Sequence, residues 1–185
     1  MRVSSSWWII GIALLAAPVA ASAERVYRNA EHGFRITFPQ AWQPIKANAP
    51  GTVVSYGRMS SRAGERPVIT SCNVTVGVAP STKGKGQAQI NREIEEQMPH
   101  ARANLANQFG EISEVYTRPV DYAKALVLVT SSTDDLYGRQ IALTRQILLF
   151  FKPARSFGIF CQATAGDFQK ARLLFDLIAD SFRFE

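Results

Sequence analysis

Apolar and polar residues alternate over much of the chain, and this alternation predicts β-strands. The clearest case is Phe34–Phe38, in which every second residue is apolar, as in a strand with one buried face. Pro39 ends this strand, because proline has no N–H to donate to a neighbouring strand. The predicted strands are Glu24–Asn29, Phe34–Phe38, Val53–Arg58, Ser71–Val78, Glu111–Arg118, Ala123–Ser131, Arg139–Phe151 and Phe157–Ala163.

Two segments instead repeat their apolar residues every three or four positions, which predicts helices with one buried face. The first runs from about Gln87 to Asn107, and Pro99 is expected to kink or split it, because its ring clashes with the preceding turn. The second follows Gly166, with Asp167 as its N-cap, and its apolar stripe continues to Phe182. This order, with short connections between strands, predicts an α+β domain in which helices cover an antiparallel β-sheet.

The N-terminus has the pattern of a secretory signal peptide. Arg2 supplies a positive charge, an apolar run extends from Trp7 to Ala17, and Ala21-Ser22-Ala23 forms a small-x-small cleavage site. The alternative is an uncleaved N-terminal anchor, but the apolar run is only about half as long as a bilayer requires. We therefore expect cleavage near Ala23, which leaves residues 24–185 as a single periplasmic or secreted domain without a stable membrane anchor.

The net charge is positive, but the basic residues are scattered. The formal charge is +6, and the densest basic group is Arg58, Arg62 and Arg66, in an expected loop. Proteins that bind nucleic acid usually gather their positive charge on one face, with aromatic residues between the charges. We therefore expect no nucleic-acid partner, and we interpret the excess charge as an aid to solubility with weak attraction to anionic surfaces.

The chain has two cysteines, and both are in phase with the apolar face of a predicted strand. These are Cys72 and Cys161. In an oxidising compartment, an isolated pair is a candidate disulfide. The alternative is a pair of buried free thiols.

No motif for a metal, a cofactor or a nucleophile is recognisable. His32 and His100 lie in unrelated segments, and the spacings typical of zinc sites, calcium loops and Gly-x-Ser-x-Gly elbows are missing. Asp134 and Asp135 fall in an expected hairpin turn, Thr133–Gly138, where aspartate often bonds its own backbone. We expect no catalytic residues, no metal site and no cofactor, and hence no enzyme.

The run Lys83-Gly84-Lys85-Gly86 precedes the first helix, where a phosphate could bind the free N–H groups. It lacks the Gly-Lys-Ser/Thr ending of a phosphate-binding loop, so it is interpreted as a flexible connection.

Arg145 is an exception to the pattern, because it is in phase with apolar residues of its strand. The apolar residues are Ile141, Leu143, Ile147 and Leu149. A β-bulge could shift the phase, or the side chain could extend to solvent from a strand end. The sharper interpretation is a buried cation that lines a ligand pocket and binds an anionic group.

Both ends of the domain resemble the PsbP-like proteins, among them bacterial envelope proteins of the DcrB type. The opening match comprises Tyr27, Asn29 and Gly33-Phe34-Arg35-Ile36-Thr37-Phe38-Pro39-Gln40-Ala41-Trp42. The closing match comprises Phe175, Ile178 and Ser181-Phe182-Arg183-Phe184. The resemblance implies a central antiparallel sheet sandwiched between helices, and members that act mostly by binding partners rather than by catalysis. It carries over no binding residue.

The sequence therefore favours two functional hypotheses for an exported, non-enzymatic monomer over a third, a hydrolase of unrecognised type. The first is a protein-binding or assembly accessory factor of the cell envelope, which would use exposed loops such as Tyr56–Arg66 or Thr133–Tyr137. The alternative is a small-ligand or lipid-binding protein with a pocket between the sheet and a helix, to which Arg145 would contribute. The partner is accordingly an envelope protein or a small ligand, which the sequence does not identify.

Overall fold

The computed structural model describes residues 24–46, 49–60, 68–136 and 138–185, so the predicted signal peptide at residues 1–23 lies outside the described residues. Most strands of this part form one seven-stranded sheet in the order β3-β4-β5-β9-β8-β7-β6, with every neighbouring pair antiparallel. The strands are β3 (Gln43–Pro44), β4 (Thr52–Ser60), β5 (Val68–Ala79), β6 (Glu111–Val120), β7 (Ala123–Leu136), β8 (Arg139–Lys152) and β9 (Ala154–Thr164).

A second, three-stranded antiparallel sheet joins the two ends of the domain. Its strands are β1 (Glu24–Asn29), β2 (Phe34–Pro39) and β10 (Arg183–Phe184), in the order β1-β2-β10. The alternation in Phe34–Phe38 correctly predicts β2 and its buried face. It does not predict that β2 belongs to a separate sheet.

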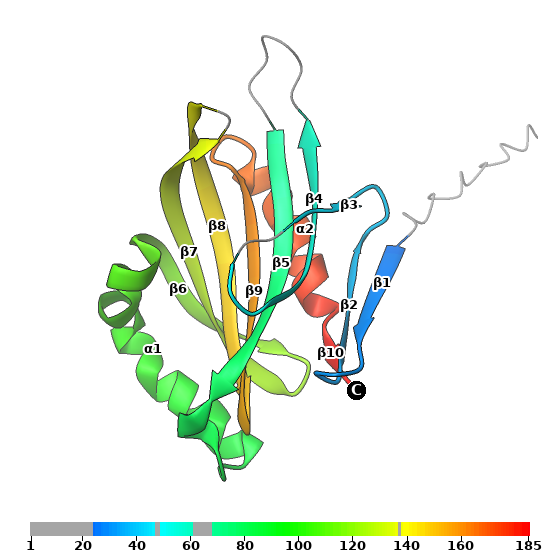
Figure 1. The fold of residues 1–185 in the computed structure, drawn as a ribbon. Helices are drawn as coiled ribbons and strands as arrows, with labels where there is room; N and C mark the ends of the chain where they lie inside the picture. The colour runs from blue at the N-terminus through cyan, green and yellow to red at the C-terminus, as the bar shows by residue number, and fades with distance from the viewer. Residues whose placement is uncertain (1–23, 47–48, 61–67, 137) are drawn as a thin grey trace, which may run out of the picture.

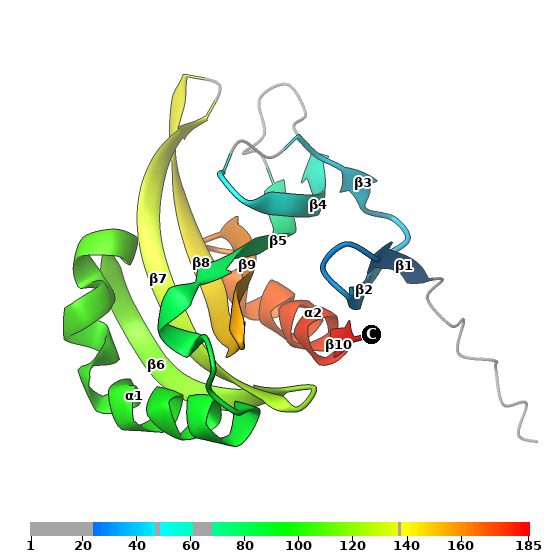
Figure 2. The same cartoon turned by 60° about the horizontal axis from the view of Figure 1, so that its bottom comes forward.

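The helices lie on opposite sides of the large sheet. A short 3₁₀ turn, η1 (Pro80–Thr82), leads from β5 to α1 (Gln87–Phe109), which contacts β6, β7 and β8. Helix α2 (Phe168–Asp180) lies on the other face, between the large sheet and the small one (Figures 1 and 2). The fold is thus the predicted α+β sandwich, an antiparallel sheet between helices, with the small sheet as an additional layer.

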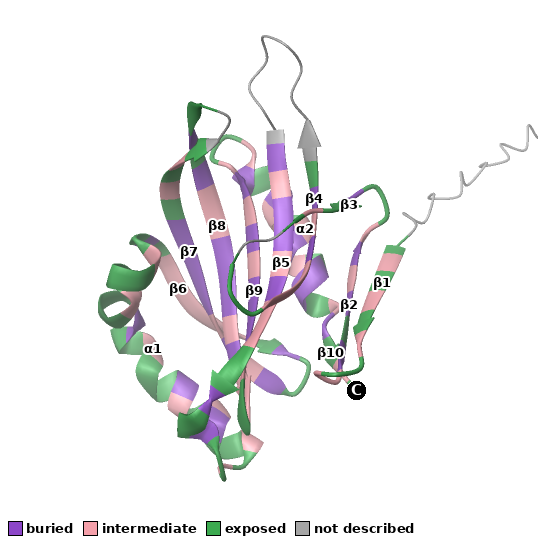
Figure 3. Ribbon diagram, viewed as in Figure 1, coloured by how far each residue is buried: buried purple, intermediate pink, exposed green. Residues whose placement is uncertain are grey.

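The main hydrophobic core fills the α2 side of the large sheet. Figure 3 shows in purple the buried residues along the strands of this sheet and on α2. Its centre is aromatic, because Phe34 stacks on Phe182 and Phe150 stacks on Phe157, with ring centroids 5.1 and 5.6 Å apart. Smaller clusters occupy the α1 side, one of them formed by Ile112, Leu128 and Ile147.

Helix α1 is continuous through Pro99, so the prediction that the proline splits the helix is wrong. Figure 2 shows instead that the helix bends along its course, in agreement with the alternative prediction of a kink. The missing N–H of Pro99 leaves one carbonyl without its helical donor, which a bend can expose to water.

Of the two predictions about aspartates, the position of the N-cap at Asp167 is confirmed and the turn at Asp134 and Asp135 is wrong. Asp167 is the N-cap residue of α2, but its carboxylate accepts a bond from Thr164 Oγ1 at 2.7 Å and makes no capping bond. Asp134 and Asp135 lie in β7 rather than in a turn, paired with Ile141 and Gln140 of β8. Pairing with β8 continues to Leu136 and Arg139, so the hairpin extends further than the two adjacent aspartates suggest.

The predicted disulfide is present between two neighbouring strands. Cys72 of β5 and Cys161 of β9 are directly opposite each other in the register, and both are buried on the α2 face. The bond links residues 89 positions apart, so it removes considerable freedom from the unfolded chain.

We expect reduction of Cys72–Cys161 to lower the free energy of unfolding by about 4 kcal/mol, because the unfolded chain gains loop entropy. Denaturant unfolding of the oxidised and the reduced protein measures this difference. The variant C72A/C161A is the control, since a reductant should leave its stability unchanged. Two titratable thiols in the denatured, unreduced protein would contradict the disulfide itself.

Candidate functional site

Helix α1 covers only part of its face of the sheet, and an apolar cleft of about 300 Å³ remains beneath it. The apolar stripe of α1 forms one wall, and outward-facing side chains of β7 and β8 form the other. The apolar lining residues are Ile90, Ile94, Ala101 and Leu105 from the helix, and Leu126, Leu149 and Phe151 from the sheet. A cleft between a helix and a sheet is what the alternative hypothesis from the sequence requires.

Polar contacts, rather than continuous apolar packing, hold α1 to the sheet. Gln87 Nε2 donates to the carbonyl oxygen of Phe151 at 3.0 Å. Asn91 bonds the backbone on both sides of Ala123, as Nδ2 donates to the Tyr122 oxygen at 3.1 Å and Oδ1 accepts from Lys124 N at 2.9 Å. These hydrogen bonds fix the first half of the helix, and no sequence motif predicts them.

An ion pair stands at the rim of the cleft. Lys85 Nζ lies 2.6 Å from Glu93 Oε2, and Glu93 also lines the cleft. The hydrogen bond from Lys85 lowers the pKa of the Glu93 carboxyl below its ordinary value. The run Lys83-Gly84-Lys85-Gly86 therefore contributes one rim residue, as part of the connection that the sequence predicts.

Arg145 lines a second, more polar hollow of about 330 Å³ on the same face. The register from β7 through β8 to β9 runs unbroken at Arg145, so no bulge turns the side chain to the other face. Its neighbours in the hollow include Asn73, Thr130, Phe160 and Gln162. Arg145 therefore shares a face with Ile147, and of the interpretations from the sequence only the β-bulge is excluded.

The charge of Arg145 already has a partner. Its Nη2 lies 2.5 Å from Asp134 Oδ2, and its Nε donates to Gln162 Oε1 at 3.1 Å. A guanidinium neutralised by a carboxylate attracts an anionic group less than a free cation does. The role of Arg145 in binding stays a prediction. Asp134 is the partner that the sequence prediction missed, because it was assigned to a turn.

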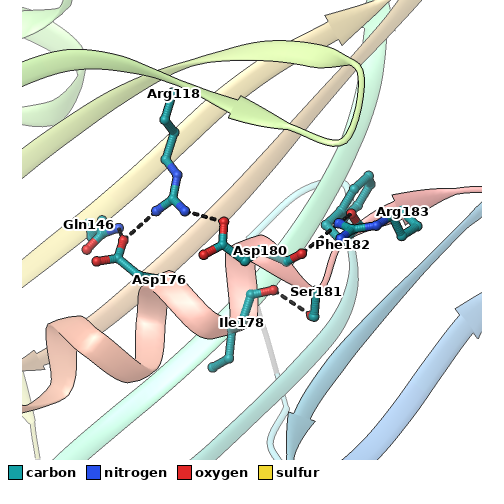
Figure 4. Close-up of polar contacts among 8 residues, drawn as sticks. All are labelled: Arg118, Gln146, Asp176, Ile178, Asp180, Ser181, Phe182 and Arg183. Carbon is teal, nitrogen blue, oxygen red and sulfur yellow. Dashed lines mark hydrogen bonds and ion pairs between the residues drawn. The ribbon is translucent and has the colours of Figure 1, made fainter.

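A third polar cluster, shown in Figure 4, ties α2 to the large sheet. Arg118 of β6 pairs with Asp176 at 2.5 Å and with Asp180, both on α2. Gln146 of β8 is fully buried, and its Nε2 donates to Asp176 Oδ1 at 2.9 Å. A further pair between the same elements, Arg172 with Glu114, lowers the pKa of the Glu114 carboxyl through a hydrogen bond. We interpret this cluster as structural, since its charges are all paired.

The remaining candidates do not come together. His32 lies in the turn between β1 and β2, and His100 lies exposed on α1. Within residues 24–46, 49–60, 68–136 and 138–185, no three His, Cys, Asp or Glu side chains are grouped as metal ligands would be. Among these same residues, no helix is long and apolar enough to cross a membrane.

Comparison with known proteins finds similarity in fold. The cyanobacterial PsbP protein (CyanoP) of Synechocystis sp. superposes with a TM-score of 0.55 at 16% identity, over 91% of this chain and 96% of that one. The chain has the PsbP-like fold. No family model matches the chain, and no curated protein matches it in sequence.

Two bacterial structures also match the PsbP-like chain, at lower scores. LpqN, described as involved in cell envelope biogenesis of Mycobacterium tuberculosis, has a TM-score of 0.47 at 11% identity, over 86% of this chain and 89% of that one. A protein of unknown function from Pseudomonas aeruginosa has a TM-score of 0.46 at 12% identity, over 85% of this chain and 94% of that one. At such identities the likeness concerns the fold alone.

We expect Asp176→Ala to lower the free energy of unfolding by about 2 kcal/mol, because it leaves the buried Gln146 without its hydrogen-bond partner. Asp180→Ala is the matched control one turn further along α2, where an exposed ion pair contributes about 1 kcal/mol or less. Asp176→Asn keeps an acceptor for Gln146 and should fall between them. Denaturant titration measures all three, and equal losses for both alanine variants would contradict the assignment.

Proposed function

We propose that this protein is a non-enzymatic binding protein that acts outside the cytoplasm and binds an apolar ligand, or the apolar part of a lipid, beneath α1. The observation that carries the proposal is the cleft between α1 and the sheet, with its walls of aliphatic and aromatic side chains. Its volume of about 300 Å³ is at the lower end of the range for ligand pockets. A single chain or ring of a ligand would therefore fit.

The chemistry around the cleft supports binding rather than catalysis. The ionisable groups nearest to the two hollows are engaged in the pairs Lys85–Glu93 and Arg145–Asp134. An enzyme of the common hydrolytic types needs a base beside a nucleophile, both free to react. An ion pair can line the rim or the wall of a cleft, but it does not supply a free base or a free nucleophile.

Two features support action outside the cytoplasm. The N-terminal sequence has a positive residue, a short apolar run and the Ala21-Ser22-Ala23 site of a signal peptide. The disulfide between Cys72 and Cys161 is of the kind that persists in oxidising compartments such as the periplasm.

A protein partner is the second candidate, and exposed residues of α2 favour it. Leu173 and Leu177 are 74% and 66% exposed and lie one helical turn apart. Exposed apolar neighbours of this kind occur at protein interfaces. The two loops predicted from the sequence, Tyr56–Arg66 and Thr133–Tyr137, give this candidate less support. Thr133–Leu136 is strand, and residues 61–67 lie outside the described part of the chain.

We expect Ala101→Phe to abolish binding of the neutral dye N-phenylnaphthylamine, because Ala101 is buried against the cleft and a phenyl ring there would occupy it. Fluorescence titration of the purified protein measures the binding. Ala103→Phe is the matched control, since Ala103 is exposed on the same helix and should leave the titration unchanged. Circular dichroism establishes that both variants are folded.

Native mass spectrometry of protein purified from its own envelope gives an independent readout. A retained apolar adduct that is lost in Ala101→Phe supports the proposal. Failure of the dye to bind the folded, unmodified protein, together with the absence of any adduct, would contradict the ligand-binding role. Crosslinking through cysteines placed at Leu173 and Leu177 would then test the protein-partner role.

A further inference from the structure

Three chain reversals meet at one end of the molecule, and their tips carry basic and apolar side chains. We call Val78, Lys83, Tyr122, Lys152 and Arg155 the basic end. The ends of β5 and β8 and the start of β9 lie together at the lower end of Figure 1. No motif in the sequence indicates this grouping, because the five residues span most of the domain.

Specific contacts bring the basic end together. Arg155 is the register partner of both Val78 and Lys152. The hydroxyl of Thr82, next to Lys83 in the chain, donates to the Lys152 oxygen at 3.0 Å and accepts from Ala154 N at 3.0 Å. Lys152 Nζ also lies 5.7 Å from the centre of the Tyr122 ring. The three tips therefore form one surface.

The cations of this surface are free of carboxylate partners. Within the described part of the chain, no carboxylate lies at ion-pair distance from Lys83, Lys152 or Arg155. Of the acidic side chains nearby, Glu93 pairs with Lys85 and Glu95 pairs with Lys124, and Asp121, next to Tyr122, accepts a hydrogen bond from the Phe184 N–H, so three cations stand against one carboxylate. The basic end thus presents a net positive charge to solvent.

Exposed apolar groups lie among these cations. Val78 is 85% exposed and Tyr122 is 51% exposed, and Pro80 and Pro153 are also exposed at the tips. Tyrosine suits the headgroup region of a bilayer, where its ring can face the hydrocarbon while its hydroxyl stays hydrated. Basic residues beside exposed apolar side chains are a combination that interfacial membrane-binding segments use.

We propose that the basic end docks on a membrane surface that contains anionic phospholipid. The charge complementarity argues for this partner, because free cations near an anionic leaflet are attracted to its surface potential. The contact is peripheral and reversible, through headgroups and a few shallow apolar side chains. It requires no anchor and no insertion of a helix.

Docking would place the α1 cleft next to the lipid. Ser81, Thr82 and Phe151 line the cleft, and they are chain neighbours of Lys83 and Lys152. This consequence alone rests on the proposed function, since docking through the basic end does not require an occupied cleft.

Co-sedimentation with vesicles tests the docking. The purified protein should bind vesicles of phosphatidylcholine with phosphatidylglycerol, and should not bind vesicles of phosphatidylcholine alone. Lys83→Glu/Arg155→Glu should weaken the binding by about tenfold or more, because each reversal replaces an attraction to the surface by a repulsion. Raising the salt concentration should also weaken it, because salt screens exposed charges.

Lys170→Glu/Arg139→Glu is the matched control, because it makes the same change in net charge at exposed positions on other elements, α2 and the far end of β8. It should stay within about twofold of the unmodified protein. Equal loss in both double variants would show that net charge alone drives binding and would overturn the proposal. Equal binding to both kinds of vesicle, or to neither, would also overturn it.

Two further measurements separate this proposal from the proposed function. Lys83→Glu/Arg155→Glu should bind the neutral dye normally in solution, and Ala101→Phe should still bind anionic vesicles. If the unmodified protein binds anionic vesicles but not the dye, the ligand-binding role is contradicted and docking through the basic end still stands. If the basic end binds polyglutamate but not the vesicles, an acidic protein partner replaces the membrane.

Discussion

The fold depends on the closure of one aromatic core by the two ends of the domain. Phe34 follows directly on the turn at Gly33, and Phe182 follows directly on α2, and the two rings stack on each other. Gly33 has a φ of +62°, and a Cβ there would lie 3.0 Å from the carbonyl oxygen of Glu185. The positive φ and the close approach of the C-terminal residue Glu185 therefore favour glycine at this position.

Ser181, in the Ser-Phe element at the C-terminus, also helps to close the core. Ser181 Oγ accepts from the backbone N–H of Thr37 at 2.8 Å and donates to the oxygen of Ile178 at 2.6 Å. One hydroxyl thus joins the end of α2 to strand β2. The segments in which the sequence resembles PsbP-like proteins are those that close this core. The resemblance therefore predicts the fold and is uninformative about binding.

The sequence predicts the strands and helices well where burial is one-sided. The alternation in β2, β5 and β9 follows directly from one face that packs in the main core, so Cys72 and Cys161 could each be assigned to the apolar face of its strand. What the pattern could not predict depends on contacts between distant segments. The separate sheet β1-β2-β10 is one case, and the pairing of Arg145 with Asp134 is another.

The cleft beneath α1 exists because the apolar stripe of this helix is weak. Only Ile90, Ile94 and Ala101 are buried in the whole of α1, whereas the shorter α2 buries five residues. A helix with so few buried apolar residues cannot cover its face of the sheet completely. Hydrogen bonds from the side chains of Gln87 and Asn91 hold it in place instead. Space therefore remains between helix and sheet, as expected where a helix is held by its edges rather than by its buried face. The same hydrogen bonds hold the start of α1 beside the basic end. Gln87 and Asn91 therefore also fix the position of the cleft next to the surface that we propose to meet the membrane.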